Sequence, residues 1–204
     1  MFLVTVALIW AVAAVTPGPN FLVAVRCSIG GSRRTAVAAV AGTLVGTAVW
    51  GVAGWLGITA LFTAAPLAYT ALKVVGGIYI AWLGIKLIRK ARRPVDPSLD
   101  ELDAVRGPRW AFRLALGTNL ANPKTAAFVA SLFAAAMPPD PAWWQGLAAV
   151  AVMLAISATW YTILVVSLTH HRVASAYRSA RRGVDAATGA LFVAFGSALA
   201  LSGR

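Results

Sequence analysis

The stretch Thr16-Pro17-Gly18-Pro19-Asn20 interrupts an otherwise apolar run that covers residues 1–25. Its two prolines lack backbone donors and clash with the preceding turn, and the glycine between them admits backbone angles that other residues avoid. A helix therefore cannot pass through this stretch undisturbed. Two structures remain open: a short loop between two helices, or a helix break inside a membrane, where the freed backbone groups need partners because lipid offers none. Asn20 is suited to bind either a solute or those backbone groups.

The composition of the chain predicts an integral membrane protein. Of its 204 residues, 60% are hydrophobic and 12% are charged, whereas a soluble domain has about 25% charged residues. Several apolar stretches reach the length of about 20 residues that crosses a bilayer as a helix, so membrane lipid is an expected partner. The net charge of +12 does not predict a nucleic-acid partner, because the basic residues flank the apolar stretches, as the positive-inside bias explains.

The sequence predicts an all-α protein with six transmembrane helices, arranged as two inverted three-helix repeats with broken first and fourth spans. The expected spans cover residues 2–25, 36–62, 67–88, 110–136, 143–168 and 184–201. The second break is Asn119-Leu120-Ala121-Asn122-Pro123-Lys124, inside the fourth span. We therefore divide the chain into a first repeat over residues 1–88, a cytoplasmic linker over residues 89–109 and a second repeat over residues 110–204. A basic loop over residues 170–182 is expected before the sixth span.

The distribution of Lys and Arg predicts the orientation in the membrane. The loops after the first, third and fifth spans contain nearly all of these residues, whereas the loops after the second and fourth spans contain none. Because cytoplasmic loops are enriched in positive charge, we expect the odd-numbered loops in the cytoplasm and both termini outside. Residues 1–15 lack the basic n-region of a signal peptide, so we expect the first span to be retained.

An internal repeat supports this organisation. Ordered matches link the two halves at offsets that grow from 104 to 112 residues: Pro19 with Pro123, Thr47 with Ser157, Trp50 with Trp160, Lys73 with Asp185, Gly77 with Gly189 and Gly84 with Gly196. With three spans in each half, the second half must be upside down relative to the first. Inverted repeats with a broken helix in each half are typical of secondary transporters, whose substrate site lies near the midplane between the repeats.

Known catalytic and phosphate-binding motifs are missing from the sequence. It contains no GxxxxGK[ST] loop, no H-E-x-x-H pair and no G-x-S-x-G elbow. No carboxylate lies deep within an expected span, and the single cysteine, Cys27, cannot form an intramolecular disulfide or a cysteine metal cluster. We therefore expect neither an enzyme nor a protein that binds a metal or cofactor.

The expected spans contain several neutral hydrogen-bonding groups, and the second break adds a cation, Lys124. These polar residues are Thr16, Asn20, Thr47, Thr118, Asn119, Asn122, Lys124 and Ser157. A lysine inside a span costs about 2.5–3.5 kcal/mol on the insertion scale, so Lys124 needs a partner: a substrate carboxylate, carbonyls freed at a break, or a lipid phosphate. The half-helix N-termini after Pro19 and Pro123 would also attract an anion. A small solute with a carboxylate and an amine fits this set.

We take Asn20, Thr47, Asn119, Asn122 and Lys124 as the candidate substrate-binding residues. The breaks would be shaped by Pro17, Gly18, Pro19 and Pro123. Three alternatives stay open: an amino-acid exporter, an exporter of another small solute, or a membrane scaffold whose polar residues only join helices. The closely spaced glycines of the second span, Gly42 and Gly46 among them, would serve either internal packing or homo-oligomer formation.

The motifs also resemble those of a known family. Thr16-Pro-Gly-Pro-Asn20, Gly42-x-x-x-Gly46, Tyr79-x-x-Trp82-Leu-Gly84-x-Lys86 and Asn119-x-x-Asn122-Pro-Lys124 together resemble the LysE/RhtB family of amino-acid exporters over nearly the whole chain. The resemblance implies export of amino acids or their derivatives across the bacterial inner membrane, driven by the proton motive force. Many members carry an acid after the second glycine of the second span, where this chain has Thr47, which puts a proton-coupling carboxylate in doubt.

Overall fold

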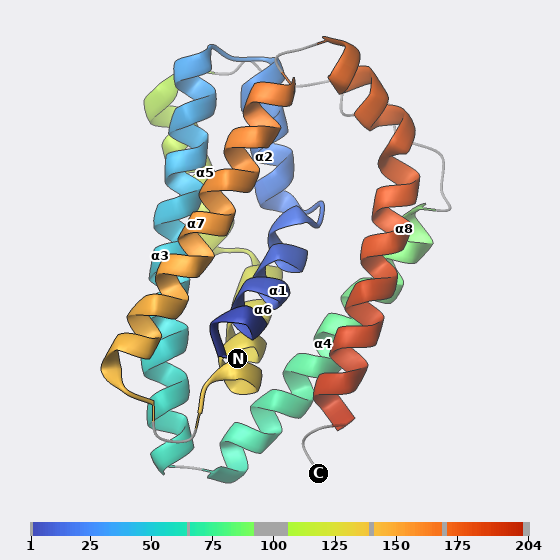
Figure 1. Ribbon diagram of the computed structural model, residues 1–204. Coiled ribbons are helices and arrows are strands. Elements are labelled where there is room, and N and C mark those ends of the chain that lie inside the picture. The colour runs from blue at the N-terminus through green and yellow to red at the C-terminus, as the bar shows by residue number, and fades with distance from the viewer. Residues whose placement is uncertain (1, 65, 92–105, 139–140, 169–170, 202–204) are drawn as a thin grey trace.

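The computed structural model describes residues 2–64, 66–91, 106–138, 141–168 and 171–201. In these ranges the chain forms eight α-helices and no strand, which confirms the predicted all-α class. The helices, shown in Figure 1, are α1 (Phe2–Val15), α2 (Pro19–Ile29), α3 (Arg33–Ala64), α4 (Pro66–Ala91), α5 (Pro108–Leu120), α6 (Pro123–Ala136), α7 (Trp143–Leu168) and α8 (His171–Leu201).

Both expected helix interruptions are present at the expected residues. Helix α1 ends before the Pro-Gly-Pro stretch and α2 begins at Pro19, with a bend of 57° between the two helices. Helix α5 ends at Leu120 and α6 begins at Pro123. Each of these prolines occupies the start of a helix, where its missing N–H would have no partner in any case. The residue before each proline, Gly18 or Asn122, has an extended backbone.

Two of the helices are long and apolar enough to cross a membrane on their own. These are α3, over Arg33–Gly57, and α7, and the bent pair α1 and α2 is a third candidate if it forms one span. Large apolar side chains on the outer faces of α3 and α7 are exposed, among them Val49 and Ile163. Such a surface fits contact with lipid tails. The described residues thus support a membrane protein, while the number of six spans stays a prediction.

The basic loop predicted over residues 170–182 is wrong for its described part. Helix α8 begins at His171, well before the predicted start of the sixth span at residue 184. Residues 172–182 consist largely of Arg, Ala and Ser and contain neither glycine nor proline, so nothing in them interrupts a helix. Residues 92–105 of the predicted linker lie outside the described residues. Of its two ends, residues 89–91 belong to α4, residues 106–107 precede α5, and residues 108–109 belong to α5.

Helices α4 and α8 pack closely against each other through four glycines. A Cβ atom added at Gly77 would lie 2.7 Å from the Gly196 carbonyl oxygen, and one added at Gly84 would lie 2.5 Å from that of Gly189. The backbones of the two helices therefore lie very close together, as is common in membrane proteins where small residues occupy the interface between helices. The internal repeat in the sequence pairs Gly77 with Gly189 and Gly84 with Gly196. In the structure Gly77 instead faces Gly196, and Gly84 faces Gly189, because the two helices run antiparallel (Figure 1).

Three glycines of α3, Gly42, Gly46 and Gly54, serve internal packing. A Cβ atom at Gly42 would clash with the Phe112 carbonyl oxygen of α5, and one at Gly46 would lie 2.7 Å from Asn119 Oδ1. Farther along α3, Gly54 faces Val129 of α6. Of the two roles that the sequence left open for Gly42 and Gly46, these contacts match internal packing.

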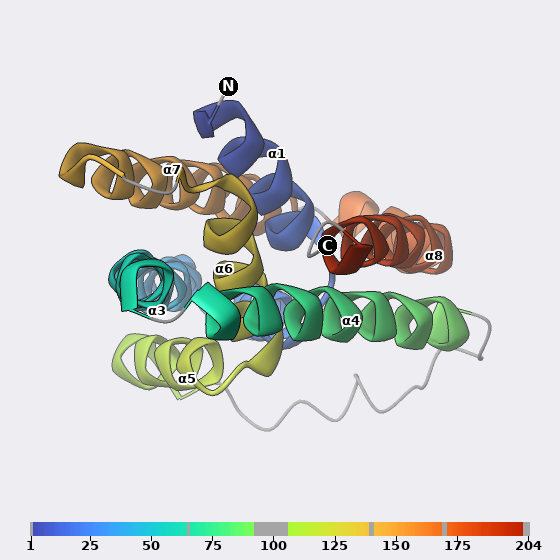
Figure 2. The same ribbon diagram turned by 90° about the horizontal axis from the view of Figure 1, so that it is seen from below.

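The broken helices lie among the long ones. Figure 2 shows α6 near the centre of the molecule, with α3, α7 and α4 around it, and α1 beside α7. The largest buried cluster joins side chains of α1, α4, α6, α7 and α8, including Trp10, Phe128, Phe133, Met153 and Phe192. A second cluster, around Phe21 and Tyr161, joins α2 and α7 with α3. The start of α1 and the end of α8 lie toward the same end of the molecule (Figure 1).

Candidate functional site

Lys124 connects the second break to the first. It lies in the first turn of α6, and its Nζ atom donates to the carbonyl oxygens of Ala13 at 3.3 Å and Thr16 at 3.0 Å, at the end of α1. The helical donor for the Ala13 carbonyl would be residue 17, a proline without an N–H. The C-terminal end of a helix carries partial negative charge, so a cation is favourable there. The partner of Lys124 is therefore the carbonyl group freed at the break, one of the three partners left open by the sequence.

Two neighbouring groups shape the surroundings of the Lys124 ammonium. The Nζ atom lies 5.4 Å from the centroid of the Phe192 ring, a cation–π distance. On the side of the break, a Cβ atom at Gly18 would lie 3.4 Å from Nζ. The Gly18 backbone thus lies beside the ammonium, and a Cβ atom there would make an ordinary van der Waals contact with it.

Asn122 caps α6 at the second break. Its Oδ1 atom accepts from the backbone N–H of Lys124 at 3.0 Å, the usual bond of an N-cap asparagine. Its Nδ2 atom donates to Asn20 Oδ1 at 3.4 Å, and Asn20 Nδ2 donates to Thr125 Oγ1 at 3.3 Å. A chain of three polar side chains thus joins the start of α2 to the start of α6. Asn20 binds side chains of the other break here.

Asn119 attaches the end of α5 to the middle of α3. It is 1% exposed, and its Nδ2 atom donates to the Thr43 carbonyl oxygen at 3.3 Å and to Thr47 Oγ1 at 3.4 Å. Its own carbonyl oxygen accepts from the indole Nε1 of Trp50 at 3.2 Å. The Asn119 Oδ1 atom is buried without a hydrogen-bond partner and lies against Gly46. Asn119 therefore holds the break in place and keeps one free acceptor.

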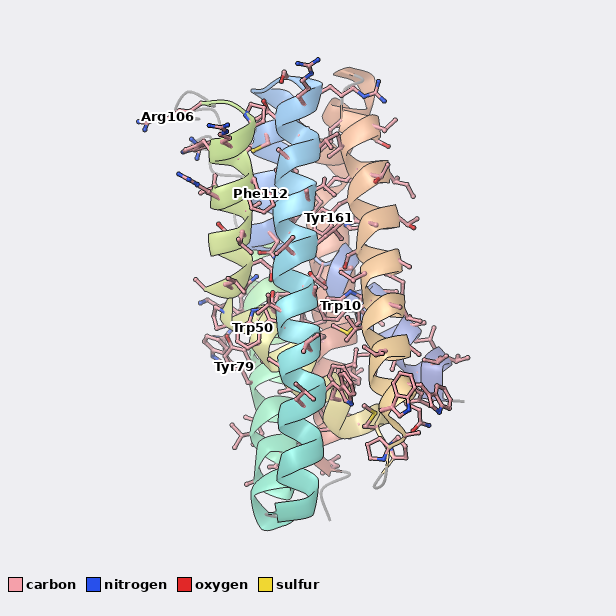
Figure 3. The ribbon with its side chains drawn as sticks, turned by 90° about the vertical axis from the view of Figure 1, so that its left-hand side faces the viewer. Trp10, Trp50, Tyr79, Arg106, Phe112 and Tyr161 are labelled. Carbon is pink, nitrogen blue, oxygen red and sulfur yellow. The ribbon has the colours of Figure 1, made fainter. Side chains whose placement is uncertain are left out.

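A second pair of side chains attaches α1 to α7. Trp10 Nε1 donates to Ser157 Oγ at 2.9 Å, and both residues are buried. In Figure 3 the labelled Trp10, from α1, and Tyr161, from α7, appear between α3 and α7 at different heights. The Thr47 and Ser157 hydroxyls, matched in the sequence repeat, thus each accept a hydrogen bond from a broken helix, α5 or α1.

These groups surround one cavity. The cavity has a volume of about 30 Å³, room for a few water molecules, and is smaller than an amino acid. Its walls are Trp10, Ala13, Ala14, Thr16, Gly18, Asn20, Phe21, Thr43, Thr47, Asn119, Asn122, Lys124, Thr125, Phe128, Ser157 and Tyr161. Lys124 is the one charged residue in this lining. Side chains of both buried aromatic clusters contribute to its walls, Trp10 and Phe128 from the first and Phe21 and Tyr161 from the second.

The structure brings together all five candidate substrate-binding residues: Asn20, Thr47, Asn119, Asn122 and Lys124 line the same cavity. Of the break residues, Gly18 lines it, whereas Pro17, Pro19 and Pro123 set the helix ends. Thr118 is half-buried and belongs to α5 outside this lining.

Sequence reasoning did not select several lining residues, chiefly Trp10, Thr43, Thr125 and Tyr161. Thr43 lies one helical turn before Thr47, a spacing that places both on one face of α3. Trp10 gave no such signal, because a tryptophan inside an apolar run resembles any lipid-facing or core residue. Among the described residues there is also no cluster of three or more His, Cys, Asp and Glu side chains suited to a metal ion.

The chain is similar to one known protein family and to several known membrane proteins. The family model for LysE type translocators matches residues 11–203. The threonine efflux protein of Escherichia coli (strain K12) is 27% identical over 204 residues, which cover 99% of this chain and 98% of that protein. The homoserine/homoserine lactone efflux protein of Salmonella typhimurium is 29% identical over 194 residues, with coverage of 92% and 90%. An uncharacterised membrane protein of Pseudomonas aeruginosa is 32% identical over 191 residues, with coverage of 90% and 88%. No solved structure matches the chain.

Apolar helices around a small polar cavity define a helical membrane protein with a polar interior. The chain belongs to the LysE type translocator family, whose model covers nearly all of it. It is a translocator and not an enzyme. The resemblance drawn from the sequence motifs is thereby confirmed.

Proposed function

We propose that this protein is a secondary active exporter of amino acids or amino-acid derivatives, with the solute bound in the cavity between the two helix breaks. The observation that carries the proposal is the position of Lys124, a single cation among neutral hydrogen-bonding groups. A carboxylate would form charge-assisted hydrogen bonds with its ammonium, which are stronger than bonds to neutral carbonyls. A solute carboxylate can therefore compete with the α1 carbonyls for Lys124.

The remaining groups suit the rest of an amino acid. Asn119 Oδ1, which has no partner, and the hydroxyl oxygens of Thr47 and Ser157 can accept hydrogen bonds from a solute ammonium or hydroxyl. A solute with a cationic side chain is disfavoured, because the one charge in the lining is also positive. The relatives described as threonine and homoserine efflux proteins agree with this choice. We therefore expect amino acids with small, uncharged side chains as substrates.

Transport would follow from alternating access between two inverted repeats. The repeats would comprise residues 1–88 and 110–204, joined by a cytoplasmic linker over residues 89–109, with six spans in total. Two features support this organisation: a polar break at the matched prolines Pro19 and Pro123, and the crosswise approach of the glycine pairs of α4 and α8. The location would be the bacterial inner membrane, with both termini outside and the proton motive force as the energy source.

A transport assay in cells tests this function. Cells that lack their own exporters would be loaded with labelled threonine, homoserine, lysine or glutamate, and efflux would be followed with and without the protein. We expect faster efflux of threonine and homoserine, and loss of that gain in Asn20→Ala and Lys124→Ala. Unchanged efflux by normally inserted variants would contradict the site. No efflux of any amino acid by the intact protein, in cells or in vesicles, would favour another solute or a scaffold.

The orientation has a separate test. A reporter fused after Arg204 should give the signal of an external C-terminus. A cytoplasmic signal would contradict the proposed topology without bearing on the substrate.

A further inference from the structure

Trp50 supplies a hydrogen bond that the second break removes. In an intact helix the Asn119 carbonyl would accept from the N–H of residue 123, but that residue is Pro123 and has no N–H. The indole Nε1 of Trp50, on α3, donates to this carbonyl at 3.2 Å, and the Asn122 N–H does so at the same distance. The tryptophan of one long helix thereby fixes the end of the broken helix beside it.

Trp160 is the counterpart of Trp50 in the sequence repeat and lies on α7. Its indole Nε1 is buried, and no hydrogen-bond partner for it exists among the described residues. A buried N–H group without a partner is unfavourable and therefore rare in folded proteins. The two halves of the molecule thus differ: one tryptophan of the pair is bonded and the other is not.

The carbonyl that corresponds to Asn119 is that of Val15. Residue 15 lies 104 residues before residue 119, the same offset that relates Pro19 to Pro123. The helical donor for the Val15 carbonyl would be residue 19, again a proline. Helices α1 and α7 are already joined at the adjacent turns by the bond from Trp10 to Ser157, three residues before Trp160. Trp160 therefore lies on the helix that flanks the end of α1.

The end of α1 has a different donor in this structure. Lys124 Nζ binds the Ala13 and Thr16 carbonyls, on both sides of Val15. In alternating access the two inverted repeats move against each other around the site, so the arrangement of one half in this structure serves as the template for the other half in the opposite state. The bond from Trp50 to the Asn119 carbonyl would then have an equivalent in the opposite state, from Trp160 to the Val15 carbonyl, once α1 has moved.

We infer that Trp160 is a positioning residue that donates to the Val15 carbonyl in the opposite-facing state, after Lys124 has released the α1 carbonyls. In that state the bond from Trp50 to Asn119 is lost. The two indoles thus donate to the two broken helices in turn. The bond from Trp50 stabilises the state seen in this structure, and the bond from Trp160 stabilises the state that opens to the other side of the membrane. This inference rests on the proposed transport by alternating access, and it adds the donor that holds α1 in the state the structure does not contain.

Opposite effects of two matched substitutions test the inference. Ala14 lines the cavity, so Ala14→Cys in a Cys27→Ala background gives a thiol whose labelling by a membrane-impermeant maleimide can be measured from each side in vesicles of known orientation. Trp50→Phe should shift the ratio of labelling from the two sides in one direction and Trp160→Phe in the other, each by about two- to tenfold, the population change for one lost buried hydrogen bond. A shift in the same direction, or none for Trp160→Phe, would overturn the inference.

A second replacement separates the indole N–H from the bulk of the ring. Incorporation of 3-benzothienylalanine at position 160 replaces the N–H by sulfur and keeps the size of the side chain. It should reproduce the shift of Trp160→Phe, and wild-type labelling in this variant would overturn the inference even if Trp160→Phe fails to fold. No solute is needed in the assay. Opposite shifts in a protein that exports no amino acid would therefore refute the proposed substrate and support the role of Trp160. Export of amino acids without the shifts would support the proposed function and refute the role of Trp160.

Discussion

The Lys124 ammonium lies 3.0 Å from the Thr16 carbonyl oxygen and thereby joins the start of α6 to the end of α1. One side chain from the second half of the protein neutralises the helix end that the first break creates. The same side chain is the one charge that faces the cavity. Its structural role and its proposed role in binding are therefore in competition, and a bound carboxylate would loosen the contact between α6 and α1.

Replacement of this lysine by methionine should separate the two roles. In Lys124→Met the α1 carbonyls lose a charged donor, so we expect a lower melting temperature of the purified protein. Added threonine should raise the melting temperature of the wild type and have no effect on the variant, because hydrogen bonds to a charged group contribute about 1.5–3 kcal/mol. Thermal unfolding in detergent with and without threonine measures both effects.

Lys86 offers the matched control for this substitution. It is exposed on α4, with its ammonium 4.8 Å from the Trp82 ring and outside the cavity lining. Lys86→Met should keep the threonine response. An undiminished response in Lys124→Met would rule out a bond between this ammonium and the solute carboxylate.

Substitutions of two glycines on α3 test the position of Asn119. In Gly46→Ala the new methyl group would lie 2.7 Å from Asn119 Oδ1 and 2.8 Å from its Cγ atom. The asparagine must move and weaken its bonds to Thr43 and Thr47, so we expect a loss of stability of about 1–3 kcal/mol and a marked fall in efflux. Gly57→Ala makes the same change where nothing lies within 4 Å, and both properties should stay near wild type. Equal behaviour of the two variants in unfolding and efflux assays would contradict the packing described for Gly46.

The contact between α4 and α8 predicts a second sensitive glycine. A methyl group at Gly84 would lie 2.5 Å from the Gly189 carbonyl oxygen and 2.7 Å from the Val193 nitrogen, both backbone atoms that cannot turn aside. Gly84→Ala should therefore force the helices apart and lower the yield of folded protein and its melting temperature. Gly117→Ala on α5, with nothing within 4 Å, should leave both unchanged. Size-exclusion profiles and thermal unfolding compare the pair, and a stable, monodisperse Gly84→Ala protein would show that this contact is looser than described.

The sequence was most informative where local chemistry decides the structure. Proline lacks an N–H and therefore kinks a helix, ends it or begins it. Both breaks were predicted at the correct residues for this reason, and α7 has the predicted ends. The five polar residues of the candidate site were found because polar groups inside apolar spans are unfavourable without partners. The start of α8 was misplaced because positive charge predicts the side of the membrane and does not prevent a helix.

Long-range partners could not be derived from the sequence. The carbonyl oxygens that bind Lys124 lie 108 and 111 residues away, and a carbonyl is present at every residue, so no sequence pattern marks these two. Trp10 and Ser157 are 147 residues apart. The repeat identified Ser157 as the counterpart of Thr47, yet its donor is a tryptophan on α1 and not an asparagine. Such pairs follow from how the helices are packed.

The bond from Trp10 to Ser157 provides the last prediction. Ser157→Ala leaves the indole N–H of Trp10 buried without its acceptor, and Trp10→Phe leaves the serine hydroxyl without its donor. Each single variant should lose stability, by about 1–3 kcal/mol for Ser157→Ala, and by more for Trp10→Phe because the smaller ring also leaves a cavity. The double variant should lose less than the sum, with a coupling of about 0.5–1.5 kcal/mol, because the second substitution removes a group that is already unpaired. Denaturant unfolding of the four proteins in one detergent measures the coupling, and strict additivity would mean that the two side chains do not share this bond.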